Sequence, residues 1–233
     1  MANKTPNQQK NTEGLVAVES ALSRTEQFIE DNQKLIFGII LGVVLIIGGY
    51  VAYVKFVTEP RNEEAISQMF VAEKYFERDS FNLALNGDAN YPGFLGIIDD
   101  YSGTKSANLA KYYAGVCYMQ LGQFDNAIEY LKDFSTSDLL LAPIAKGLIG
   151  DAYMEKNMVN DAITYYKNAI EVNNNDLTTP LYLYKLGRSY ELINKNEDAL
   201  TAYEKIYKSF PRSSEARTIE KNITAVKIKL GQI

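Results

Sequence analysis

The longest apolar stretch of the chain runs from Leu35 to Val54, twenty residues without a charge or a proline, between Lys34 and Lys55. A helix of this length, at about 1.5 Å per residue, matches the hydrocarbon core of a bilayer, about 30 Å thick. We therefore predict a transmembrane helix over residues 35–55. Because 34 mostly polar residues precede it, we expect a retained anchor and not a cleaved signal peptide.

Small residues recur on one side of this predicted helix. At 100° per residue four of them fall within a sector about 80° wide, namely Gly38, Gly42, Gly49 and Ala52. The first two form a G-x-x-x-G pair, which lets another membrane helix pack closely. Glycine is also common in membrane helices without such a partner, so both interpretations stay open.

The segment before the anchor divides into two parts. Residues 1–12 are rich in Asn, Gln and Lys, which predicts disorder. Residues 13–34 carry apolar side chains at spacings of three and four, which predicts an amphipathic cytosolic helix that pairs with another helix or lies on the membrane surface. Basic residues on the two sides of the anchor balance, so charge alone does not set the orientation.

Three segments after the anchor share one pattern: a glycine, a tyrosine three positions later and an alanine nine positions after the tyrosine. The sets are Gly115, Tyr118, Ala127; Gly150, Tyr153, Ala162; and Gly187, Tyr190, Ala199. Each predicts two antiparallel helices joined by a short polar turn, in which the Gly and Ala let the backbones approach and the Tyr packs against the neighbouring unit.

This spacing resembles the tetratricopeptide-repeat (TPR) family. Pro143 and Pro180 suit first helical turns, and Pro211 follows the third unit as a helix stop. The resemblance covers residues 106–212 as three repeats and implies an all-α protein, a single transmembrane helix followed by a TPR-type α-solenoid. The repeat offsets of 35 and 37 residues exceed the usual length of about 34, which implies slightly longer turns.

Two segments flank the repeats. Residues 56–105 predict a linker helix and a degenerate first repeat, with one helix carrying Tyr75 and Leu85 and another running from Phe94 to Tyr101. Residues 213–233 predict a capping helix that ends at Gly231. Its inward-facing residues are expected to be Ile219, Ile223, Val226 and Leu230.

The residue types that the chain lacks, together with its net charge, exclude several kinds of catalytic, metal and nucleic-acid site. The chain has no His and one Cys, which excludes His relays and His-ligated metals. Its net charge of −5, without basic clusters, argues against nucleic-acid binding. Cys117 lies in an apolar helical run and is predicted to be buried. Neither Asp99 with Asp100 nor the run 173–176 has calcium-loop spacing. We therefore predict no catalytic residue, no metal and no cofactor.

The remaining candidate is a protein-binding surface. In TPR superhelices the first helices line the concave side, so the resemblance predicts a groove formed by Tyr112, Met119, Asp151, Met154, Tyr184, Arg188 and Glu191. Aromatic and Met side chains with a few charges suit the capture of an extended or helical peptide. The alternative is that these side chains only pack repeat against repeat.

The order of parts is similar to the YfgM-like family of ancillary SecYEG translocon subunits. The run Tyr101-Ser102-Gly103-Thr104-Lys105, which leads into Tyr113-Ala114-Gly115, resembles the start of that family's repeats. The resemblance implies a single-pass protein of a bacterial inner membrane, with a cytoplasmic N-terminus and a periplasmic TPR domain. Its implied partners are the SecYEG translocon, a PpiD-like chaperone and exported clients. The alternative is a scaffold for envelope or division machinery that also self-associates.

Overall fold

The computed structural model describes residue 28 and residues 30–233, and the chain divides into two compact units, residues 1–57 and 58–233. In the first unit α2 spans Gln33–Tyr53, and a π-helix, η1, continues over Val54–Thr58 to the first residue of the second unit. Among the described residues, one helical stretch is long and apolar enough to cross a membrane, and it contains α2. The predicted disorder over 1–12, and most of the helix predicted over 13–34, fall outside the described residues.

The second unit begins with three helices: α3 (Glu59–Glu77), α4 (Phe81–Asn86) and α5 (Phe94–Asp100). The sequence predicted one helix carrying both Tyr75 and Leu85, and this was wrong. Asp79 has a φ of 56°, and the N–H of Ser80 bonds back to the carbonyl of Tyr75 at 2.9 Å. Aspartate tolerates this left-handed conformation better than most residues, so α3 ends there without a glycine.

An aromatic cluster holds the leading helices to the first repeat. The rings of Phe94 and Tyr113 stack 4.9 Å apart, and Phe76 contacts Tyr113 edge-on at 5.1 Å. At the start of α3, the side-chain oxygen of Asn62 accepts hydrogen bonds from the backbone N–H and the hydroxyl of Ser106. The leading helices and the first repeat therefore share one core.

Cys117 lies in this core, fully buried. Burial raises the pKa of its thiol to about 12, so the reactive thiolate is absent at neutral pH. We expect a maleimide at pH 7 to leave the folded chain unlabelled and to label Cys117 once the repeats are unfolded in urea. An exposed cysteine, introduced as Thr201→Cys, serves as the reactive control. Rapid labelling of the native wild-type chain would contradict this prediction.

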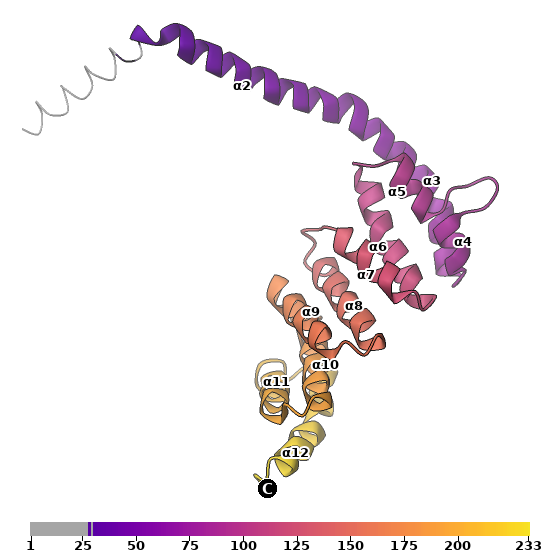
Figure 1. Ribbon diagram of the computed structural model, residues 1–233, viewed down its shortest axis with the longest axis vertical. Coiled ribbons are helices and arrows are strands. Elements are labelled where there is room, and N and C mark those ends of the chain that lie inside the picture. Colours follow the sequence, from indigo (N-terminus) through magenta and orange to yellow (C-terminus); the bar gives the residue numbers. More distant parts are fainter. Residues whose placement is uncertain (1–27, 29) are drawn as a thin grey trace, which may run out of the picture. The chain divides into compact units, whose positions relative to one another are not determined.

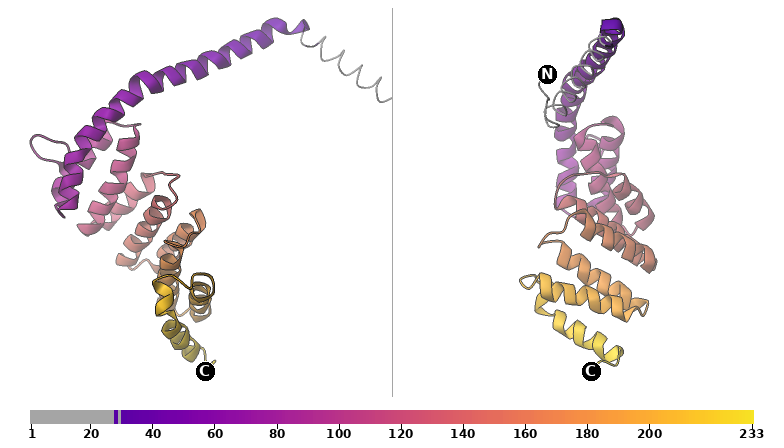
Figure 2. Two further views of the ribbon diagram at one scale, coloured as in Figure 1. Left: turned by 180° about the vertical axis from the view of Figure 1, so that it is seen from behind. Right: turned by 90° about the vertical axis from the view of Figure 1, so that its left-hand side faces the viewer.

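Three helical hairpins follow, stacked side by side (Figures 1 and 2). They are α6 (Lys105–Gln120) with α7 (Phe124–Asp133), α8 (Leu141–Glu155) with α9 (Val159–Val172), and α10 (Thr179–Leu192) with α11 (Asn196–Ser209). The turns within the hairpins contain one residue each with positive φ: Gly122, Asn157 and Asn194. No strand forms over residues 30–233, in agreement with the predicted all-α solenoid.

The prolines lie where the sequence placed them, whereas the capping helix, predicted from residue 213, begins only at Ile219. Pro143 and Pro180 stand in the first turns of α8 and α10, and α11 ends before Pro211. A short 3-10 turn, η2 (Glu215–Arg217), precedes the last helix, α12 (Ile219–Lys229). Ile219 and Val226 are fully buried against the third hairpin. The end of the solenoid is therefore covered by α12.

Candidate partner-binding surfaces

Each repeat glycine faces a bulky side chain on the second helix of its hairpin. A Cβ added at Gly115 would lie 2.5 Å from Leu131, and one at Gly150 would lie 2.6 Å from the ring of Tyr166. Gly187 meets the ring of Tyr203 in the same way. These distances are too short for a side chain, so the glycines permit the close approach that the spacing predicted.

The repeated tyrosines of the first two hairpins each stack on a second tyrosine of the same hairpin. Tyr118 stacks on Tyr130 and Tyr153 on Tyr165, with ring centroids 5.3 Å apart in both pairs. The preceding repeat contributes a lysine: Lys132 donates to the hydroxyl of Tyr153 at 3.0 Å. The predicted packing against the neighbouring unit is thus made by this lysine, while the ring partner comes from within the hairpin.

Asp151, a predicted groove residue, links the second and third repeats. One of its oxygens accepts from the hydroxyl of Tyr166 at 2.8 Å, and Lys185 on α10 donates to both oxygens at 2.7 and 2.6 Å. Burial and the nearby carboxylate raise the pKa of the Tyr166 phenol. The charge of Asp151 is therefore already neutralised inside the domain.

Glu191 is held in the same way at the boundary with the capping helix. It accepts from the hydroxyl of Tyr203 at 2.6 Å and from Lys229 on α12 at 2.8 Å. Burial opposes ionisation, but the bonds from Lys229 and Tyr203, together with the charge of Arg188, lower the pKa of Glu191 below its ordinary value. Both carboxylates predicted for the groove are thus paired with a lysine of another helix, Asp151 with Lys185 and Glu191 with Lys229.

The lowered pKa of Glu191 predicts a loss of stability in acid. A carboxyl group whose folded pKa lies below its unfolded value stabilises the fold above the unfolded value, and this contribution disappears as pH falls through the folded pKa. We expect Glu191→Gln to unfold at lower urea concentration than wild type at pH 7, and the gap between the two to narrow when the pH is lowered below the ordinary glutamate pKa of about 4.3. A gap that is the same at both pH values would contradict the prediction.

Arg188 remains available on the same face of α10. It is exposed, and it takes no part in the ion pairs formed within residues 30–233. One turn earlier, Tyr184 is half-buried with its ring centroid 6.2 Å from that of Tyr203. Of the three charged residues predicted for the groove, Arg188 is the one that forms no ion pair with another described residue, so its guanidinium can pair with a partner.

The other predicted groove residues contribute to packing between helices. Tyr112 is half-buried, with its ring centroid 5.5 Å from that of Phe134, and Met119 packs in the same cluster. The sulfur of Met154 lies 3.6 Å from the hydroxyl of Ser189 on α10. All three lie on first helices, and their contact with a partner stays a prediction.

Family models of the tetratricopeptide repeat match residues 109–137, 145–176 and 182–213. These units are tetratricopeptide repeats. The TPR domain indicates a protein–protein interaction module, and this fold is typically a non-catalytic scaffold. No curated protein sequence matches the chain.

Two crystal structures are similar in fold to this chain. One is a MamA protein, 23% identical, for which the match covers 72% of this chain and 84% of the other with a TM-score of 0.52. The second is a putative kinesin light chain from Podosopora anserina with nearly identical TPR-like repeats, 14% identical, covering 73% and 88% of the two chains, with a TM-score of 0.52. At these identities the likeness concerns the fold alone.

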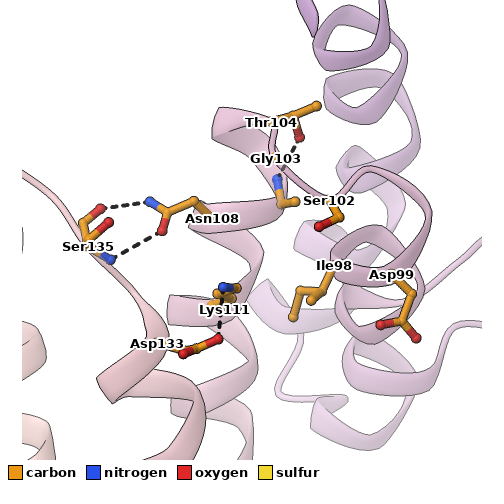
Figure 3. Close-up of a pocket in the computed structure, with 10 residues that line it drawn as sticks. Ile98, Asp99, Ser102, Gly103, Thr104, Asn108, Lys111, Asp133 and Ser135 are labelled. Atoms are coloured by element: carbon orange, nitrogen blue, oxygen red, sulfur yellow. Dashed lines mark hydrogen bonds and ion pairs between the residues drawn. The ribbon is translucent and has the colours of Figure 1, made fainter.

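The cavity in Figure 3 lies beside the start of α6 and the end of α7, with a volume of about 650 Å³. Its polar groups mostly bond to one another. Lys111 pairs with Asp133 at 2.9 Å, and the side chain of Asn108 exchanges two hydrogen bonds with the backbone of Ser135. Among the described residues, no group of three or more His, Cys, Asp or Glu is placed to hold a metal. The cavity presents no arrangement typical of a catalytic centre.

The small face of the anchor is open in the structure. Apart from the chain neighbours and the helix's own backbone, no atom of the described residues lies within 4 Å of a Cβ built at Gly38, Gly42 or Gly49, and Ala52 is exposed. A second helix at this face stays a prediction.

Sequence reasoning missed the two lysines that neutralise the groove carboxylates. Lys185 lies 34 residues from Asp151, and Lys229 lies 38 residues from Glu191. The available signal was the replacement of Leu131 by Tyr166 and Tyr203 at the equivalent positions, because a buried phenol requires a polar partner.

Proposed function

We propose that this chain is a membrane-anchored TPR module that acts as an accessory subunit of the SecYEG translocon. In this role it joins the translocon to a PpiD-like chaperone and to exported clients. The observation that carries the proposal is the presence, in one chain, of a helix apolar enough to cross a membrane and of TPR repeats. The translocon itself is suggested by the resemblance to the YfgM-like family.

The proposal places the N-terminus in the cytoplasm and the TPR domain in the periplasm of a bacterial inner membrane. The partner-binding residues are those of the first-helix face, Tyr112, Met119, Asp151, Met154, Tyr184, Arg188 and Glu191. Arg188 is the one we expect to contribute most, because its guanidinium is exposed and suits a partner carboxylate. The small-residue face of the anchor, which includes Gly42, then meets a helix of the translocon or the chaperone.

Photo-crosslinking in membranes tests this function. A crosslinkable residue replaces Tyr184 in one variant and Gly42 in another, and Tyr207 on α11, which is 49% exposed, provides the control position. We expect adducts to SecY, SecG or a PpiD-like chaperone from the first two positions, and fewer such adducts from the third. Adducts only to division proteins, or only to a second copy of the chain, would replace the translocon with an envelope scaffold.

A further inference from the structure

The third repeat lacks a ring that the first two repeats have. In the pairs formed by Tyr118 with Tyr130 and by Tyr153 with Tyr165, the second tyrosine stands twelve positions after the first. Twelve positions after Tyr190 the chain has Ala202. The third hairpin therefore has the first ring of the stack and no second one.

A cavity of about 370 Å³ lies where this second ring is missing. Its walls come from α9, α10 and α11, and both Tyr190 and Ala202 line it. Leu183 and Leu186 add apolar lining, while two lysines and two acidic residues stand around them. An apolar pocket with a few polar groups is the usual character of a site that accepts a side chain or a small ligand.

At the second repeat, a lysine lies over both rings of the tyrosine pair. The ammonium of Lys132 lies 5.4 Å from the ring centre of Tyr153 and 5.6 Å from that of Tyr165. Lys167 stands 35 residues later in the equivalent place, and its ammonium lies 5.7 Å from the ring centre of Tyr190. Lys167 therefore has one ring beneath it where Lys132 has two.

We propose that the cavity between α9, α10 and α11 binds an aromatic side chain of a protein partner. The incoming ring lies against Tyr190 and under Lys167, as Tyr165 lies against Tyr153 and under Lys132. It gains burial, offset stacking and a cation–π contact. Tyr190 is only 7% exposed because other side chains, Lys167 among them, cover its ring, and the flexible stem of an exposed lysine can move to the rim.

This site is distinct from the first-helix face, so it does not rest on the translocon role. Its residues belong to the α9 and α11 side of α10, whereas Tyr184 and Arg188 occupy the face of α10 assigned to the groove. An aromatic ring can therefore bind beside Ala202 whether or not a partner binds the face that contains Tyr184.

Disulfide tethering on the full chain in detergent tests the proposal. Thr201 is exposed and lines the cavity, so Thr201→Cys provides a thiol at the rim, while Cys117 is fully buried. The variant is equilibrated, in excess 2-mercaptoethanol, with equal amounts of the disulfides of 2-phenylethanethiol and 3-methylbutanethiol. Intact-mass spectrometry gives the adduct ratio. We expect the aromatic adduct to exceed the aliphatic one several-fold.

Three matched variants identify the origin of any preference. Ala202→Tyr, combined with Thr201→Cys, fills the cavity and should return the ratio to about one, as expected when no pocket is available. Thr164 is the equivalent of Thr201 in the second repeat; both are exposed and both donate to a carbonyl four residues earlier. Thr164→Cys should show no preference while Tyr165 is present, and adding Tyr165→Ala should create one.

Either of two results overturns the proposal. The first is equal amounts of the two adducts at Thr201→Cys. The second is an aromatic preference that persists after Ala202→Tyr, since the ring would then bind elsewhere. If the Ala202→Tyr chain fails to fold, the comparison of Thr164→Cys with and without Tyr165→Ala decides instead, and the absence of any gain in the double variant counts against the site.

Discussion

Tyr203→Ala is expected to lower the free energy of unfolding of the repeat domain by about 3–5 kcal/mol, the usual cost of truncating a large buried aromatic residue to alanine. Tyr203 is fully buried, its ring fills the space opposite Gly187, and its hydroxyl bonds to Glu191. The measurement is urea unfolding of the full chain in detergent, followed by tyrosine fluorescence and circular dichroism.

Two companion variants separate the causes of that loss. Tyr203→Phe keeps the ring and removes the hydroxyl, and it should cost about 1–3 kcal/mol because a bond to a charged acceptor is lost. Tyr207→Ala changes a 49% exposed residue of the same helix and should shift stability by no more than about 0.5 kcal/mol. Equal losses at Tyr203 and Tyr207 would show that the ring is not part of the core.

Gly150→Ala is expected to destabilise the domain by about 1–3 kcal/mol, the typical cost of overpacking a filled core. The added Cβ would lie 2.6 Å from the ring of Tyr166. That ring cannot retreat easily, because its hydroxyl bonds to Asp151 at 2.8 Å. A shift of the urea midpoint to lower concentration, without a change in slope, is the expected readout.

The control for this substitution lies in the anchor. At Gly42 a Cβ meets no atom of the described residues within 4 Å beyond its own helix backbone and chain neighbours, so Gly42→Ala should leave the unfolding transition of the repeat domain unchanged. If Gly150→Ala behaves like Gly42→Ala, the hairpin is looser at Gly150 than the structure describes.

The hairpins were predictable because their pattern reflects a steric need. Two helices that approach closely require a small residue on each, and this need recurs at a fixed spacing, as at Gly150 and Ala162. The free charge of Arg188 was not predictable in the same way. It depends on Lys185 and Lys229 neutralising the neighbouring carboxylates across repeat boundaries, and the rotation between successive repeats decides whether such side chains meet.

The break in the leading unit was missed for a different reason. The segment between α3 and α4 has no glycine or proline, and an apolar pattern from Tyr75 to Leu85 favours one continuous helix. The left-handed backbone at Asp79 ends α3 instead. The sequence does show an alanine, Ala202, where the first two repeats have a tyrosine. That a stacking partner is missing there can be recognised only from the ring pairs of the first two repeats in the structure.

The capping helix also determines the net charge at the end of the first-helix face. Because Lys229 comes from α12 and pairs with Glu191, a chain that stopped before α12 would leave only the charge of Arg188 to offset that carboxylate, and this end of the face would lose its excess positive charge. Such a shortened chain would attract different ligands from the intact one, even if its three repeats folded normally. Binding partners selected with a C-terminally truncated domain would therefore describe a surface that the whole protein does not present.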